Sequence, residues 1–120
     1  MQTKFTFKHM EPSDSIIEHA QERIMRLDKY ALRKEEKVHF LFSIQKHVQV
    51  AEIIIDAGSV HFTAVAKDEK LLAAIDYAID KLERQFIKHK EKVQNHKDFD
   101  QSNEGILTQQ IADINKRNAG

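Results

Sequence analysis

Residues 68–97 read DEKLLAAIDYAIDKLERQFIKHKEKVQNHK, a helix-length stretch in which apolar residues recur every three or four positions. At about 100° per residue, its apolar side chains fall on one face of a helix and its cations on another. The apolar face carries Leu71, Ile75, Ile79, Leu82, Phe86 and Val93, and the cationic face carries Lys81, Arg84, Lys88 and Lys92. We expect the first face to pack in a core and the second to point outward.

Four shorter segments alternate apolar and polar residues, which is the pattern of half-buried strands. These expected strands are residues 4–8, 37–44, 51–56 and 60–66. The last two flank Ala57-Gly58-Ser59, a short connection with a glycine that predicts an antiparallel hairpin. The second strand is expected to pair with the third across residues 45–49.

A first helix is expected to begin at Ser13, a plausible N-cap, and to end near Tyr30 to Arg33. Asp68 is the expected N-cap of the second helix. The order is therefore β-α-β-β-β-α, and the fold class is α+β. The compact solution for this order is a four-stranded, mainly antiparallel sheet with both helices on one face.

The chain divides into a folded part and a tail. A length of 120 residues suits one domain, which we place over residues 1–95. Beyond Val93 the apolar period fades, and Asn95 to Gly105 is polar. We expect residues 96–120 to form a polar linker and a disordered tail, because an apolar face as short as the one after Ile106 makes only a marginal helix in water.

Composition excludes several classes of protein. The chain has no cysteine, so it contains neither disulfides nor thiolate chemistry. It shows no signal peptide and no apolar run long enough to span a bilayer, and we expect a cytoplasmic protein without membrane contact. The 19 basic and 19 acidic residues balance, so an argument for a polyanionic partner depends on where the charges lie.

The basic residues concentrate in the second helix. From Lys81 to Lys97 there are six lysines and arginines against only Glu83 and Glu91. Arg23 and Arg26 form a second cationic row on the first helix, and two helices on one side of a sheet could align both rows into one positive groove. Such a groove suits a phosphate backbone. The simpler interpretation is an ordinary solvated helix face.

Several motifs resemble a known family. They are Met10-Glu11-Pro12-Ser13-Asp14, Arg23 and Arg26 leading into Leu27-Asp28-Lys29-Tyr30, Ala73-Ala74-Ile75-Asp76, Asp80-Lys81-Leu82-Glu83-Arg84-Gln85, and Lys88-His89-Lys90-Glu91-Lys92. Together they resemble the short ribosome hibernation promoting factors and the related ribosome-associated translation inhibitors. The similarity covers roughly residues 1–93.

The resemblance implies a fold similar to double-stranded-RNA-binding domains and a site on the ribosome. Family members bind the small ribosomal subunit on the path of messenger and transfer RNA, block translation and protect idle ribosomes. Carried over, contact with ribosomal RNA falls on Lys81, Arg84, Lys88, Lys90, Lys92, Arg23 and Arg26. The chain ends at Gly120, so we expect no separate C-terminal dimerisation domain like that of the long hibernation factors.

Two other binding functions stay open. In one, the outer sheet face with Leu41, Ile54 and Val65, or the tail, binds a protein; in the other, the domain binds double-stranded RNA in general.

An enzyme is not indicated. The seven histidines are scattered without a zinc-binding pair, and no glycine-rich phosphate loop exists. We expect no catalytic residue, metal, cofactor or small-molecule substrate. Asp76 and Asp80, four residues apart, are expected to be solvated or paired with a nearby lysine.

Overall fold

The structure, a computed structural model, describes residues 2–30 and 36–101, and it has the expected order of elements. The tail over residues 102–120 lies outside the described residues. The elements are β1 (Gln2–Lys8), α1 (Asp14–Ile24), the 3₁₀ helix η1 (Met25–Tyr30), β2 (Lys37–Gln45), β3 (Val48–Ala57), β4 (Val60–Asp68) and α2 (Leu71–Gln101). The predicted first helix is thus an α-helix that tightens into a 3₁₀ helix.

The four strands form one sheet in the order β1-β2-β3-β4. β1 runs parallel to β2, because α1 and η1 carry the chain back across the sheet before β2 begins. The other neighbours are antiparallel hairpins. Each hairpin turn contains a residue with positive φ, Lys46 at 59° and Gly58 at 79°. The predicted mainly antiparallel sheet is confirmed.

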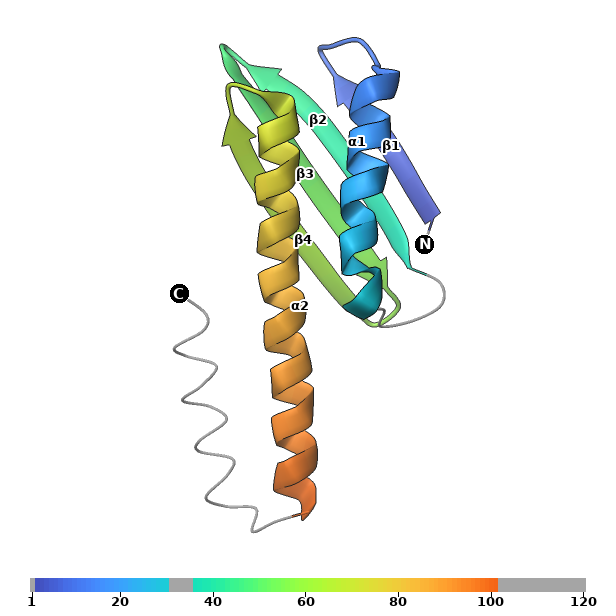
Figure 1. The fold of residues 1–120 in the computed structure, drawn as a ribbon, viewed down its shortest axis with the longest axis vertical. Coiled ribbons are helices and arrows are strands. Elements are labelled where there is room, and N and C mark those ends of the chain that lie inside the picture. The colour runs from blue at the N-terminus through green and yellow to red at the C-terminus, as the bar shows by residue number, and fades with distance from the viewer. Residues whose placement is uncertain (1, 31–35, 102–120) are drawn as a thin grey trace. The chain divides into compact units, whose positions relative to one another are not determined.

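The core lies between the sheet and the helices. α1 and the first turns of α2 cover the same face of the sheet, with α1 over β1 and β2 and α2 over β3 and β4 (Figure 1). Phe40, Phe42 and Ile53 point to this face from the sheet and are fully buried, and Ile24 and Ile79 meet it from the helices. This arrangement confirms the predicted layer of two helices on one face.

The two predicted helix caps differ in outcome. Ser13 occupies the N-cap position of α1, and its carbonyl accepts a hydrogen bond from the Ile17 amide at 3.1 Å, although its hydroxyl does not cap the helix. The assignment of Asp68 as N-cap was wrong by two residues. Asp68 ends β4, and its carboxylate accepts the Lys70 amide at 2.9 Å in the turn that precedes Leu71.

The chain forms two compact units, Met1–Glu83 and Arg84–Gly120, and α2 contributes to both. α2 continues to Gln101, into the stretch expected to be a polar linker. Residues 93–101 contain neither glycine nor proline, so helical hydrogen bonding continues after the apolar period has ended. Each unit is described separately below.

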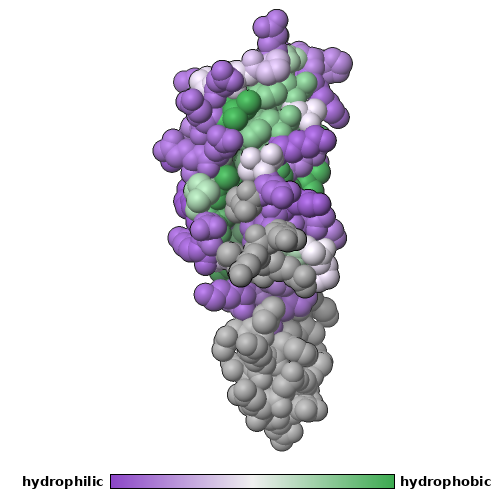
Figure 2. Space-filling model, turned by 90° about the vertical axis from the view of Figure 1, so that its right-hand side faces the viewer, coloured by the Kyte–Doolittle hydropathy of each residue, from purple (hydrophilic) through white to green (hydrophobic). Residues whose placement is uncertain are grey.

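On the side drawn in Figure 2, hydrophilic residues surround a band of hydrophobic residues in the upper part of the picture. Within the described ranges, no helix is both long and apolar enough to cross a membrane.

Candidate nucleic-acid interface

The second unit carries the densest group of cations on α2. Arg84, Lys88, Lys90 and Lys92 all have exposed side chains, and Glu91 is the one acidic residue in the helix between them. Arg84, Lys88 and Lys92 recur every four residues, so they share a face of the helix. Arg84, Lys90 and Lys92 form no salt bridge with any other residue that the structure describes. These three cations are therefore available to an external anion.

Lys81, the first member of the predicted stripe, contacts the sheet. Its Nζ donates a hydrogen bond to the backbone carbonyl of Val65 on β4. Because β4 is the last strand of the sheet, its outer carbonyls have no strand to pair with. Lys81 therefore satisfies one edge carbonyl and lies on the flank of α2 that faces β4.

Arg23 and Arg26 contact the opposite flank of α2. Arg23 Nε lies 3.3 Å from Asp76 Oδ1, and Arg26 Nη2 donates to Asp80 Oδ1. Arg26 Nε also lies 3.9 Å from Glu83 Oε1. Asp76 and Asp80 therefore pair with arginines of the preceding helical segment and not with a nearby lysine, which corrects that part of the expectation. Both carboxylates still reach solvent.

Two further residues extend this row of ion pairs, which we call the inter-helix ladder. The ladder consists of His19, Arg23, Arg26 and Lys29 on one side and Asp76, Asp80 and Glu83 on the other. His19 Nε2 donates to Asp76 Oδ1 at 2.8 Å, and Lys29 Nζ lies 3.8 Å from Glu83 Oε2. With histidine neutral, three cations face three carboxylates, so the ladder has no net charge.

The ladder changes the expected electrostatics of the first unit. The sequence suggested one positive groove made from both helices, but Arg23 and Arg26 face carboxylates, and Lys81 lies on the other flank of α2. A sequence signal for the ladder was present. Asp76, Asp80 and Glu83 follow one another at spacings of four and three, which places all three on one helix face.

The ion pairs of the ladder are exposed to solvent and restrain the arginines only weakly. The side chains of Arg23, Arg26, Asp76 and Asp80 are 41–46% exposed. Exposed ion pairs contribute about 0–1 kcal/mol each, because solvent screens the charges and holding two long side chains costs entropy. A phosphate can therefore reach either arginine, but it must first replace the carboxylate that the arginine already contacts.

The described part of the chain contains no candidate metal-binding site. No three histidine or carboxylate side chains there gather closely enough to hold an ion. The arrangement described above is instead one of cations presented on helices.

Comparison with known proteins identifies a family. A family model described as Sigma 54 modulation protein / S30EA ribosomal protein matches residues 3–94. The chain is 32% identical over 98 residues to the ribosome hibernation promoting factor of Escherichia coli K12, covering 80% of this chain and 100% of that protein. It is also 32% identical over 92 residues to the factor of Azotobacter vinelandii, covering 77% and 85%.

Solved structures agree. The Thermus thermophilus Protein Y N-terminal domain matches with a TM-score of 0.66 and 30% identity, covering 72% of this chain and 96% of that domain. A ribosomal subunit interface protein from Coxiella burnetii shares the fold, with a TM-score of 0.69 and 22% identity over 76% of this chain and 99% of that one. The resemblance noted in the sequence is confirmed, and the chain belongs to the Sigma 54 modulation protein / S30EA ribosomal protein family, which includes the ribosome hibernation promoting factors.

Proposed function

We propose that this protein is a non-enzymatic ribosome hibernation factor that binds the small ribosomal subunit near the decoding region, on the path of messenger and transfer RNA. Bound there, it inhibits translation and stabilises idle ribosomes. The observation that carries the proposal is the row of exposed cations on α2 from Arg84 to Lys92. The names of the curated relatives support hibernation as the process.

The contact is electrostatic. Arg84, Lys88 and Lys92 share a face of α2, and Lys90 lies between two of them in sequence. Each phosphate that these side chains neutralise releases condensed counterions, which favours binding without reading the base sequence. Such contacts fix the position and orientation of a protein on RNA. This suits a factor that occupies one place on every ribosome.

Arg23, Arg26 and Lys81 also join the contact, but each must exchange its present partner. Each already has a partner within the chain, so a phosphate must replace a carboxylate of the ladder or the Val65 carbonyl. The protein needs no cofactor, membrane or small-molecule substrate for this function, and we expect it in the cytoplasm with the ribosomes.

Cosedimentation with purified small subunits tests the proposal. The double variant Arg84→Glu with Lys88→Glu should no longer cosediment, because two attractive contacts become repulsive. Its thermal stability should stay close to that of the unaltered protein, because both side chains are exposed. A double variant that cosediments normally would show that the stripe is not the binding site.

Two exposed lysines of the first unit provide a matched control. Lys46→Glu with Lys70→Glu makes the same change of charge at two exposed lysines, one in the β2–β3 turn and one before α2. This variant should still cosediment. Equal loss in both double variants would mean that net charge alone, and not the stripe, decides binding.

Salt and competitors separate the remaining alternatives. With about five phosphate contacts, log affinity should fall against log salt with a slope of roughly −3.5 to −4.5. A flat dependence, or capture that resists nuclease, would favour a protein-interaction module. An arbitrary RNA duplex that competes as well as ribosomes would indicate general double-stranded-RNA binding.

A further inference from the structure

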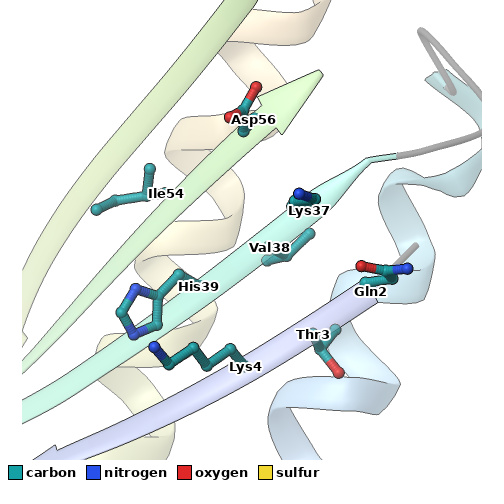
Figure 3. Close-up of a pocket in the computed structure, with 8 residues that line it drawn as sticks. All are labelled: Gln2, Thr3, Lys4, Lys37, Val38, His39, Ile54 and Asp56. Carbon is teal, nitrogen blue, oxygen red and sulfur yellow. The ribbon is translucent and has the colours of Figure 1, made fainter. Parts of the chain in front are cut away.

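The face of the sheet opposite the helices has its own arrangement of chemistry. Strand register places Lys4 of β1 beside His39 of β2, and His39 beside Ile54 of β3. In the next row, Lys37 lies between Gln2 and Asp56. Figure 3 shows Lys4 and His39 extending side by side in front of the strands, with the helices behind the sheet.

These side chains surround a hollow of about 440 Å³. Its lining residues are two lysines, one histidine, two aliphatic residues and three other polar residues: Lys4, Lys37, His39, Val38, Ile54, Gln2, Thr3 and Asp56. The volume lies within the range of small-molecule and cofactor pockets, roughly 300–1,000 Å³. The hollow is therefore large enough for one nucleotide.

The cations of the hollow are available. Lys4 and Lys37 form no salt bridge with another described residue. Asp56 is the carboxylate of the lining, and it already has partners in the β3–β4 hairpin. Its Oδ1 accepts the Gly58 amide at 3.2 Å and lies 3.5 Å from His61 Nδ1. An anion can therefore approach the lysines without first displacing a carboxylate.

The surroundings of His39 disfavour the protonated form of its imidazole. Its pKa is lowered from the ordinary 6.5, first by burial and then by the positive charge of Lys4. Glu52 acts in the opposite direction, and Lys8 adds the smallest lowering effect. Thr6 Oγ1 is hydrogen bonded to His39 Nε2 at 2.8 Å and fixes the ring. A neutral, fixed ring presents a flat face, and RNA bases that are not paired stack on such rings.

We propose that this hollow binds one nucleotide of a single-stranded RNA segment, with Lys4 and Lys37 on its phosphates and its base stacked on His39 beside Ile54. This second contact rests on the proposed function, in which the chain lies among ribosomal RNA. It gives the protein RNA contacts on the face of the sheet that the helices leave open.

A direct test uses the full chain and a short single-stranded oligoribonucleotide, followed by NMR. The amides of His39, Ile54 and their neighbours should shift most. His39→Ala should weaken binding by at least about fivefold, the lower end of base stacking on an aromatic ring. His39→Phe should bind nearly normally, because the flat ring remains. Shifts centred elsewhere, or equal binding by the alanine variant, would overturn the proposal.

The lysines are tested on whole small subunits. Lys4→Gln with Lys37→Gln should make the salt slope less steep by about 1.4 to 1.8, which corresponds to two phosphate contacts. Lys46→Gln with Lys70→Gln removes the same charge from the opposite end of the sheet and should leave the slope unchanged. Equal slopes in the two double variants would contradict a contact at the hollow.

Two controls separate this inference from its rivals. The oligoribonucleotide titration needs no ribosome, so it supports or overturns the hollow even if cosedimentation fails and the proposed function falls. Polyglutamate serves as a polyanion without bases. If it shifted the same amides with equal affinity, the hollow would be a site for acidic protein segments, and the assignment to RNA would be wrong.

Discussion

The first unit carries cations on two faces, and the faces differ in what those cations touch. On the helix face, Arg23, Arg26 and Lys29 lie against the carboxylates of the inter-helix ladder. On the outer sheet face, Lys4 and Lys37 form no salt bridge within the described part of the chain. Equal formal charge therefore does not mean equal availability to a phosphate.

The difference has an energetic consequence. A phosphate that reaches the helix face must replace carboxylates, so part of its attraction offsets ion pairs that already exist. On the sheet face it displaces only water and counterions. Lys4 and Lys37, like Arg84, Lys90 and Lys92 of α2, are therefore expected to contribute more to binding than Arg23 or Arg26.

The largest effect is expected from a substitution in the hydrophobic core between the sheet and the helices. Phe40 is fully buried, and its ring stacks on that of Phe5 with centroids 4.9 Å apart. Phe40→Ala should lower the free energy of unfolding by about 3–5 kcal/mol, the usual loss for a buried phenylalanine. Urea denaturation measures this. A loss as small as that of an exposed substitution such as Lys70→Ala would contradict the described core.

The next largest effect is expected when carboxylates of the ladder are removed, which frees its arginines. Asp76→Asn with Asp80→Asn removes the carboxylate partner of Arg23 and leaves Arg26 only its longer contact with Glu83, at 3.9 Å. If both arginines then reach phosphates at once, the salt slope for small subunits should steepen by about 1.4 to 1.8. Glu22→Gln with Asp28→Asn removes the same charge outside the ladder and should steepen it less. Identical slopes would mean that the ladder does not restrain the arginines.

A smaller effect concerns Lys81, which lies between α2 and the sheet edge. Lys81→Gln should lower stability by at most about 1.5 kcal/mol, the value of one hydrogen bond. It should change the salt slope by less than Arg84→Gln does, because the Lys81 amine is already engaged by the Val65 carbonyl. Parallel salt titrations compare the two variants. A larger slope change for Lys81→Gln would reverse this order.

The smallest effect is a pH dependence on the sheet face. Folding lowers the pKa of His39 below 6.5, so the unfolded chain binds more protons at this residue than the folded one as the pH falls. Stability should therefore decrease as the pH is lowered through 6.5, and the decrease should level off below the folded-state pKa. In urea denaturation at pH 7.5 and 5.5, the free energy of unfolding of His39→Gln should fall less between the two pH values than that of the unaltered protein. If the variant and the unaltered protein lost the same stability, His39 would not contribute to the pH dependence.

Most of the fold was predictable from the sequence. The periods of two and 3.6 residues identified all four strands and both helices, because a half-buried element repeats its apolar residues at its own geometric period. The ends of helices were less predictable. Asp68 looked like a cap yet belongs to a turn before it, and α2 continues past the end of its apolar face.

The candidate site was predictable only in part. Spacing on one helix placed Arg84, Lys88 and Lys92 on a common face, since that relation is local. Whether Arg23 meets a carboxylate depends on how α1 lies against α2, a contact between residues 53 positions apart that no local pattern contains. The hollow at His39 was missed for the same reason, because it forms only when three strands pair in register.

The sequence alone determined the elements, the apolar residues of the core, the resemblance to the family and the number of cations on each helix. These follow from chain geometry and side-chain chemistry, which act over a few residues. Only the tertiary structure decided which cations are free. The field at a cation depends on the charges within a few ångströms in space, and folding brings Asp76 and Asp80 to Arg23 and Arg26 while it leaves Lys4 and Lys37 open to solvent.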